Sequence, residues 1–268
     1  MTAASLRMFL PYDGHGPFTF GFYACAMDRA LFAAASGMAA QQRNLDTISD
    51  NLANSEVAGF KGSAEEFAAL AAPGERSMGT IPLGRHVVFT QGKLERSNGP
   101  CDLAIDGNGF FVVRDGKRVA YTRDGEFSRA ADGTLRNAAG WQLDGVRIPA
   151  DALSVNVGED GAVSATTASG ATKRITTISL ASFAAPERLE SIGGTLFVEN
   201  ARSGRARLFH PSTNGAAQIR FGMLEQSNVS IVESMMQILT AQRAYEANAK
   251  GVQAADEMLR IANNLQRG

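Results

Sequence analysis

Large apolar side chains recur every seven residues at both ends of this 268-residue chain. The N-terminal repeat follows Met27 and consists of Leu31, Met38, Leu45 and Leu52, with Ile48 on the same face. The C-terminal repeat consists of Ile231, Ile238, Tyr245, Val252 and Leu259. A seven-residue repeat keeps one stripe of a helix directed at a partner helix. Two such stripes predict terminal helices that pack as a coiled coil or against neighbouring molecules.

The N-terminal helix is predicted over residues 28–54. Alanine is dense between residues 30 and 40, which favours helix and permits the close approach of a neighbour. The helix is expected to end near Asn54, because Ser55 and then Gly59 interrupt the pattern.

Residues 1–26 precede this pattern and are interpreted as an extension, a disordered arm or the product of an upstream start, with Met27 as the native first residue. A secretory signal needs a continuous apolar segment of about 7–15 residues. Here residues 11–17 break the apolar stretch, and Arg7 is the only positive side chain before Met27. No cleaved signal peptide is therefore expected.

The C-terminal helix is predicted to begin after Ser227-Asn228. Ser230 and Glu233 have the spacing of a capping box, in which each side chain bonds the backbone N–H of the other residue. The pattern continues to about Gln266, so about 36 residues would form a rod about 54 Å long. Such a length suggests contacts beyond a single globular unit.

Residues 60–222 between the helices are predicted to form an antiparallel β-rich domain. A strand is expected at residues 86–90, and successive hairpins are expected over residues 101–148. Asp-Gly pairs tolerate the positive φ of tight turns and are strong hairpin signals. They occur at Asp106-Gly107, Asp115-Gly116, Asp124-Gly125, Asp132-Gly133, Asp144-Gly145 and Asp160-Gly161. The fold class is therefore α+β, with helical assembly segments at 27–59 and 223–268 flanking the β domain.

Composition gives no reason to expect nucleic acid or membrane insertion. The 26 Lys and Arg residues nearly balance 27 Asp and Glu residues, for a net charge of -1. No run approaches the roughly 18 apolar residues that span a bilayer. Cys25 and Cys101 lack any metal or redox spacing and are predicted to be unpaired thiols, with a single disulfide as the alternative.

No constellation of an enzyme is present in the sequence. His15, His86 and His210 are isolated, with no nearby metal or nucleophile motif. A calcium loop starting at Asp106 would need Gly at its sixth position and Glu at its twelfth, which are Phe111 and Lys117. No catalytic residue, cofactor site or metal site is predicted.

Several segments resemble the bacterial flagellar rod and hook proteins. Residues 48–54 and 59–61 resemble the N-terminal motif of that family, and residues 103–113 and 121–127 resemble its central segment. Residues 224–229 and 242–246 are similar to its C-terminal motif. The matching positions given most weight are Asn51, Leu52, Ala53, Asn54, Gly59, Phe60, Lys61, Asp106, Gly107, Gly109, Phe110, Ser227, Asn228, Gln242, Arg243, Tyr245 and Glu246.

The resemblance implies a structural subunit of the basal-body rod, most like the distal rod proteins, with the proximal rod paralogue as the alternative. It implies export through the flagellar channel without a cleaved signal peptide. Subunits would stack helically into a hollow, periplasm-spanning shaft, with terminal helices inside and β domains outside. The implied partners are further copies of the chain, other rod proteins, the hook, the ring bushing and the export apparatus.

Two other classes of protein remain open from the residues alone. A secreted binding module with a helical stalk would be a folded oligomer whose terminal helices are ordered without other rod proteins. An enzyme on a β-rich scaffold would have a deep polar pocket with a convergent acid–base pair. The Asn51–Asn54 turn and the Ser227-Asn228 pair are predicted to position the helices against the β domain, with simple capping as the alternative.

Overall fold

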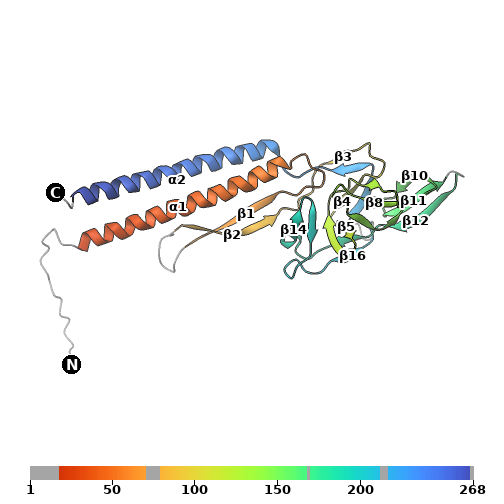
Figure 1. Cartoon of the computed structure of the whole chain (residues 1–268), viewed down its shortest axis with the longest axis horizontal. Coiled ribbons are helices and arrows are strands. Elements are labelled where there is room, and N and C mark those ends of the chain that lie inside the picture. Colours follow the sequence, from red (N-terminus) through yellow and green to blue (C-terminus); the bar gives the residue numbers. More distant parts are fainter. Residues whose placement is uncertain (1–17, 71–78, 168–169, 212–216, 266–268) are drawn as a thin grey trace, which may run out of the picture. The chain divides into compact units, whose positions relative to one another are not determined.

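The computed structural model describes residues 18–70, 79–167, 170–211 and 217–265 (Figure 1). The chain divides into two compact units. One contains residues 1–42, 67–82 and 241–268, and the other contains residues 43–66 and 83–240. The predicted division into assembly segments and a β domain concerns roles in assembly, and it stays a prediction.

Two long helices lie near the ends of the chain. Helix α2 spans Ile231–Leu265, which agrees with the predicted C-terminal helix. The hydroxyl of Ser230 accepts a hydrogen bond from the backbone N–H of Glu233 at 3.4 Å, so Ser230 is the N-cap residue. None of the helices in the described residues is long and apolar enough to cross a lipid bilayer.

Helix α1 spans Phe18–Ala53 and begins ten residues before the predicted start. Residues 18–26 are helical, so the expectation of a disordered arm was wrong for them. The physical reason lies in proline placement, because no proline occurs between Pro17 and Pro73 to stop the helix. Residues 1–17 lie outside the described residues, and the assignment of Met27 as the native start stays a prediction.

Strands β1 (Ser63–Ala69) and β2 (Thr80–Val87) form a two-stranded ribbon. The strand predicted at residues 86–90 was therefore misplaced, because β2 ends at Val87. Beyond that point the carbonyl oxygens of Val88 and Thr90 accept hydrogen bonds from side chains instead of a neighbouring strand. In the smaller unit, the hydroxyl of Ser36 on α1 accepts a hydrogen bond from the N–H of Thr80 at 3.1 Å.

The remaining strands belong to the larger unit and form antiparallel sheets, as the α+β prediction required. A nine-stranded sheet contains the order β14-β15-β6-β5-β9-β8-β7, and β13 pairs with both β5 and β16. Strands β10, β11 and β12 form a second sheet, and β17 pairs with β4 as β18 pairs with β3. Their bounds are β3 Leu94–Arg96, β4 Leu103–Gly107, β5 Phe110–Asp115, β6 Arg118–Thr122, β7 Ser128–Arg129, β8 Thr134–Arg136, β9 Gln142–Arg147, β10 Ala152–Val157, β11 Ala162–Thr167, β12 Thr172–Thr177, β13 Leu180–Ser182, β14 Glu190–Gly193, β15 Leu196–Val198, β16 Arg207–Phe209, β17 Ala217–Phe221 and β18 Met223–Glu225. A short 3₁₀ helix, η1, spans Pro186–Arg188.

Half of the Asp-Gly pairs form the predicted hairpins. Asp115-Gly116 joins β5 to β6, Asp132-Gly133 joins β7 to β8, and Asp160-Gly161 joins β10 to β11. The pair at Asp144-Gly145 instead lies inside β9.

The hairpins predicted at Asp106-Gly107 and Asp124-Gly125 were wrong. Strand β4 pairs with the distant β17 instead of β5, which follows it directly. A β-carbon on Gly125 would lie 1.6 Å from the carbonyl oxygen of Leu103, so the glycine permits a close backbone approach. A dipeptide specifies local turn geometry, whereas strand pairing is decided by burial across the whole sheet.

The main core of the larger unit lies between its sheets. Fully buried side chains include Leu103, Ile105, Phe111, Leu135, Leu143, Leu180 and Ile219. Phe110, Tyr121 and Phe197 belong to a second cluster, in which aromatic rings meet edge to face. Cys101 is buried and unpaired, and burial raises the pKa of its thiol. Nothing is described of the Cys25 side chain.

Candidate functional site

A buried ion pair connects the segment after α1 to the segment before α2. The ammonium of Lys61 lies 2.6 Å from Oε1 of Glu225, and their side chains are 1% and 0% exposed. Lys61 also donates to the carbonyl oxygen of Thr90 at 2.7 Å, and Oε1 of Glu225 accepts from the N–H of Gly92 at 2.9 Å. The two buried charges are therefore paired and also hydrogen-bonded to the backbone.

Arg123 adds a second cation to the same carboxylate. Its Nη1 lies 3.3 Å from Oε2 of Glu225, and its Nη2 donates to the carbonyl oxygen of Gly107 at 2.8 Å. The guanidinium lies over the ring of Phe110, 5.4 Å from the centroid. Within the described residues, Nε of Arg123 is the one buried side-chain nitrogen or oxygen without a hydrogen-bond partner. We call Lys61, Arg123 and Glu225 the buried triad.

The protonation of the triad depends on its single carboxylate. Burial lowers the pKa of both Lys61 and Arg123, because a buried cation loses its hydration. Glu225 acts to raise the pKa of both groups, through its negative charge and its hydrogen bonds. Removal of this carboxylate would leave two buried cations without a counter-ion.

Gly59 allows the backbone to pass close to the buried triad. Its φ of 67° is favourable for glycine, and a β-carbon there would lie 2.3 Å from the backbone nitrogen of Asp124. The N–H of Gly59 donates to the carbonyl oxygen of Glu225 at 2.7 Å. Phe60 is buried as well. Gly59 therefore permits a close backbone approach, Phe60 contributes a buried apolar side chain, and Lys61 contributes a buried charge.

Two asparagine amides hold the start of β1. Asn51 on α1 exchanges two hydrogen bonds with the backbone of Ser63, donating to its oxygen at 2.7 Å and accepting from its nitrogen at 2.9 Å. Asn228, just before α2, accepts from the N–H of Gly62 at 2.8 Å and donates to the oxygen of Val88 at 2.7 Å. These contacts attach the C-terminal end of α1 and the segment before α2 to neighbouring residues of one ribbon. We call them the amide clamps.

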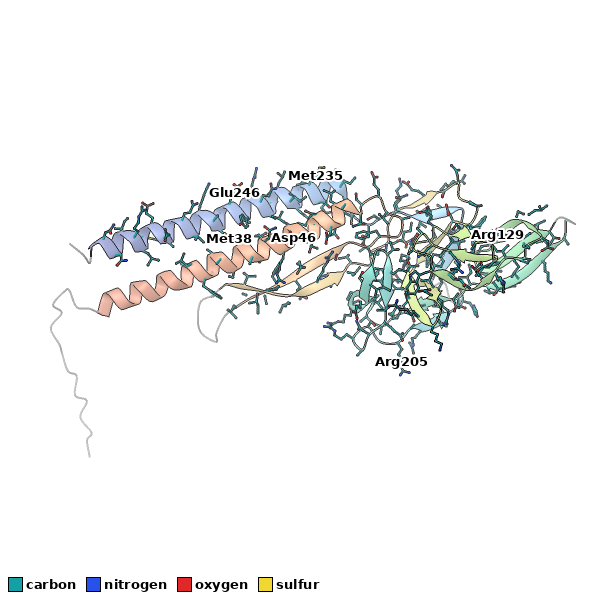
Figure 2. The ribbon with its side chains drawn as sticks, viewed as in Figure 1. Met38, Asp46, Arg129, Arg205, Met235 and Glu246 are labelled. Atoms are coloured by element: carbon teal, nitrogen blue, oxygen red, sulfur yellow. The ribbon has the colours of Figure 1, made fainter. Side chains whose placement is uncertain are left out.

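Helix α2 exposes many large apolar side chains. Val232, Met236 and Leu239 are 70%, 64% and 57% exposed, and Figure 2 labels Met235, which is also exposed. Of the predicted stripe, Ile238, Val252 and Leu259 are half-buried, while Ile231 and Tyr245 are exposed. On α1, Ile48 is buried, and Leu31, Met38, Leu45 and Leu52 are half-buried.

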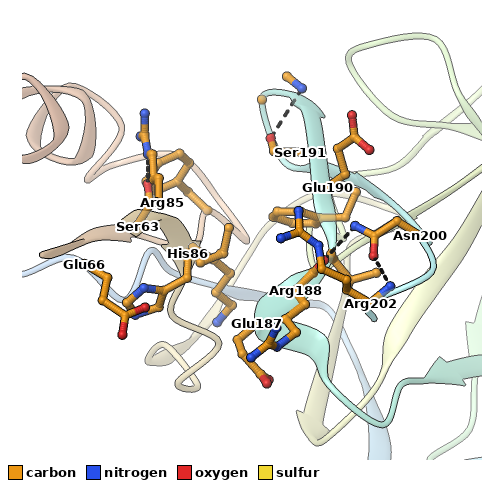
Figure 3. A pocket seen from close by; sticks show the side chains of 18 of the residues that line it. Ser63, Glu66, Arg85, His86, Glu187, Arg188, Glu190, Ser191, Asn200 and Arg202 are labelled. Atoms are coloured by element: carbon orange, nitrogen blue, oxygen red, sulfur yellow. Dashed lines mark hydrogen bonds between the residues drawn. The ribbon is translucent and has the colours of Figure 1, made fainter. Parts of the chain in front are cut away.

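A groove of about 650 Å³ lies elsewhere in the larger unit, between residues of β2 and the η1–β14 segment (Figure 3). Its charged lining has both signs and includes Glu66, Arg85, Glu187, Arg188 and Arg202, and His86 also lines it. Asn200 organises one wall, donating to the oxygen of Arg188 and accepting from the nitrogen of Arg202, both at 2.8 Å. Across the described residues, no group of three or more His, Cys, Asp or Glu side chains is placed to hold a metal ion.

Comparison with known protein families gives three matches to flagellar proteins, each to a different part of the chain. The family described as flagella basal body rod protein matches residues 31–61. The flagellar hook protein FlgE/F/G D1 domain matches residues 104–165, and the flagellar basal body rod FlgEFG protein C-terminal family matches residues 221–265.

Individual relatives match nearly the full length. The flagellar basal-body rod protein FlgG of Borreliella burgdorferi is 39% identical over 90% of this chain and 100% of its own. The FlgG proteins of Bacillus subtilis and Caulobacter vibrioides are 33% and 35% identical, over 90% and 89% of this chain and 100% and 99% of their own. The chain belongs to the FlgG family of flagellar basal-body rod proteins. It is a structural subunit of the rod and not an enzyme.

The structure brings together only some of the family-motif residues. Lys61 belongs to the buried triad, Gly59 and Gly107 bond to its members, and Phe110 lies beneath Arg123. Asp106 lies nearby in sequence but pairs with Arg220 at 3.2 Å, at a partly exposed site. A β-carbon on Gly109 would lie 3.2 Å from the ring of Phe209.

The family-motif residues on the two helices and at their ends do not gather at one site. Asn51 and Asn228 form the amide clamps, whereas Asn54 donates to the oxygen of Asp50 within its own helix end. Ser227 accepts from the N–H of Val229, a local turn contact. Leu52 is half-buried and Ala53 exposed, and exposed positions on α2 hold Gln242, Arg243, Tyr245 and Glu246, the last labelled in Figure 2.

Sequence reasoning missed the charge partners of Lys61. Arg123 and Glu225 each lay within a recognised family motif, but nothing in the local pattern linked them across 102 residues. One signal was available at Lys61, which stands between Phe60 and Gly62. A charged side chain that becomes buried in such a setting needs a partner. Arg123 is followed by Asp124 and Glu225 by Gln226, so neither of these charges carried the same signal.

Proposed function

We propose that this chain is a distal rod subunit, assembling with further copies of itself into a helical, hollow shaft that transmits torque to the hook. The observation that carries the proposal is the exposure of Val232, Met236 and Leu239 on one long helix. Exposed apolar surface of this kind marks an interaction site. A head-to-tail contact repeated by rotation and rise gives an open filament.

Different segments have different roles in this proposal. Residues 27–59 and 223–268 form the assembly segments, whose helices pack as a coiled-coil layer along the inside of the shaft. Residues 60–222 form the outer β-rich layer. The amide clamps and the buried triad position the two helical segments against the ribbon, and both are supported by the contacts of Asn51, Asn228 and Glu225.

Location and partners follow from the same proposal. The subunit reaches the periplasm-spanning rod through the flagellar export apparatus without a cleaved signal peptide. It contacts other rod proteins, the hook and the ring bushing. The names of the relatives favour the distal rod, and the proximal rod paralogue is the alternative.

Electron microscopy of purified basal bodies from a deletion strain tests the proposal. We expect rods that stop beyond a short proximal stub, and full rods after complementation with a chain starting at Met27. Truncation at the base would assign the chain to the proximal rod. Intact rods without the gene would contradict a rod function.

A pair of neighbouring variants tests the helical interface in the same strain. Ile238→Asp places a charge at a half-buried position of the predicted stripe, and Gln237→Asp places the same charge at an exposed position on a different side of the helix from Met236. A buried unpaired charge costs several kcal/mol, so Ile238→Asp should abolish full-length rods. Gln237→Asp should leave them nearly unchanged. Equal rod numbers for both variants would remove the stripe from the interface.

A further inference from the structure

The buried face of α2 carries small side chains at seven-residue spacing. Ser234, Ala241 and Ala255 are 5%, 3% and 4% exposed, and Asn248 completes the series as a half-buried residue. This series lies three residues after the stripe of large apolar residues that was predicted from sequence. Asn248 is its one member with a side-chain amide.

Asn248 meets a glycine on α1. A β-carbon built on Gly37 would lie 2.9 Å from Nδ2 of Asn248 and 3.3 Å from its Cγ. Both residues belong to the smaller compact unit. Glycine is unfavourable inside a helix, so its presence in the middle of α1 calls for a packing reason. The amide of Asn248 fills the space that a side chain at position 37 would need.

The positions one heptad away on α1 do not offer this space. Residue 30 is alanine and residue 44 is asparagine, so both carry a β-carbon. Sliding the helices by one heptad in either direction would therefore direct Asn248 at an occupied position. A single polar residue in a helical seam is known to select one register and one partner.

We propose that Asn248 and Gly37 are specificity-determining residues that fix the register of α2 on the α1 helix of the same subunit. The other buried residues at this spacing on α2, Ser234, Ala241 and Ala255, are small and offer little shape to distinguish one register from another. Met236 and Leu239 are exposed on the same helix. The consequence for rod assembly rests on the proposed function, whereas the register itself does not.

Disulfide trapping in the purified full-length chain measures the register. Gly37 and Asn248 are kept, and the cysteines are placed one heptad away from them. Because the two helices run in opposite directions (Figure 1), Ala30→Cys with Ala255→Cys reports the register that places Gly37 at Asn248, and Ala30→Cys with Ala262→Cys reports a one-heptad shift. Cys25 is replaced by Ser, and Cys101 is retained because its side chain is buried. The 30–255 pair should form an intrachain disulfide about tenfold faster than the 30–262 pair, and this preference should shrink when Gly37→Ala and Asn248→Ala are added.

A double-mutant cycle tests whether the amide and the glycine determine the fit. Gly37→Ala should lower the thermal midpoint of helix loss when Asn248 is present, and should raise it in the Asn248→Ala chain through better helix propensity. The same sign in both backgrounds would overturn the proposal. Equal trapping of the 30–255 and 30–262 pairs while Gly37 and Asn248 are present, an unchanged preference after both are replaced by Ala, or only interchain disulfides, would also overturn it. These outcomes are separate from rod truncation, which tests the proposed function.

Discussion

The buried triad and the surface of α2 differ in which kind of side chain is buried and which is exposed. Lys61, Arg123 and Glu225 are charged and almost completely buried, and each ionised group meets its counter-ion within the chain. Val232, Met236 and Leu239 are apolar and more than half exposed. One region places charge where water is absent, and the other places hydrocarbon where water is present.

The difference separates folding from assembly. The buried triad is complete within one chain, so its contribution belongs to the stability of the single subunit. The exposed face of α2 gains its stabilisation only when another surface removes it from water. Changes in the triad should therefore alter unfolding, whereas changes on α2 should alter association.

The largest effect is expected from Glu225→Gln. This change leaves the cations of Lys61 and Arg123 buried without a counter-ion, and breaking a buried pair in this way costs about 3–5 kcal/mol. Urea denaturation followed by the fluorescence of Trp141 measures the loss, since that residue lies in the same unit.

Glu95→Gln provides the matched control for that substitution. Glu95 pairs with Lys93 at 2.8 Å, but the two side chains are 45% and 79% exposed. An exposed ion pair of this kind contributes about 0–1 kcal/mol. Similar losses for the two Glu→Gln variants would show that burial does not distinguish the triad.

Asp124 gives the next effect, which depends on pH. Burial raises its pKa to about 6 from 3.8, so the folded chain holds this proton more tightly than the unfolded chain. The stabilisation from this group should therefore be complete below about pH 4, be lost as the pH rises to about 6, and change little above that.

Asp124→Asn should flatten this dependence and stabilise the chain at pH 7 by up to about 3 kcal/mol. The amide oxygen can still accept the hydrogen bond from the N–H of Glu126, which is 2.9 Å from Oδ1 of Asp124. Urea denaturation of both chains between pH 4 and pH 7 measures the effect. Parallel stability curves would contradict the raised pKa.

A smaller loss is expected when an amide clamp is removed. Asn228→Ala leaves the N–H of Gly62 and the oxygen of Val88 without their partner, at a cost of about 1–3 kcal/mol. Asn54→Ala is the control, because Asn54 makes one exposed bond to the oxygen of Asp50 and its loss should cost less than about 1 kcal/mol. Equal losses would mean that Asn228 acts as an ordinary helix-end residue.

Local patterns predicted those features that depend on local sequence. The bounds of α2, the Ser230 cap and the turn at Asp115-Gly116 each follow from a few neighbouring residues. The pairing of β4 with β17 does not, because turn chemistry at Asp106-Gly107 gives no information about a strand more than 100 residues away.

The candidate site shows the same limit. The Gly59-Phe60-Lys61 motif was recognisable, but its partner Glu225 lies 164 residues from Lys61. The heptad pattern identified two helices, yet among the described side chains of α2 the buried ones are Ser234, Ala241 and Ala255. Large apolar residues predict that a helix has a partner, but close packing of the helix against its own chain can select small residues and leave large ones exposed.

The smallest effect on the single subunit is expected from Leu239→Ser. Leu239 is 57% exposed, and exposed substitutions usually change stability by no more than about 0.5 kcal/mol. Helix α2 should therefore melt at nearly the same temperature by circular dichroism, while the number of full rods per cell falls sharply. A loss near 2 kcal/mol in the purified subunit would mean that Leu239 is already covered within one chain. The division between a self-contained triad and an assembly face on α2 would then fail, because both regions would contribute to folding.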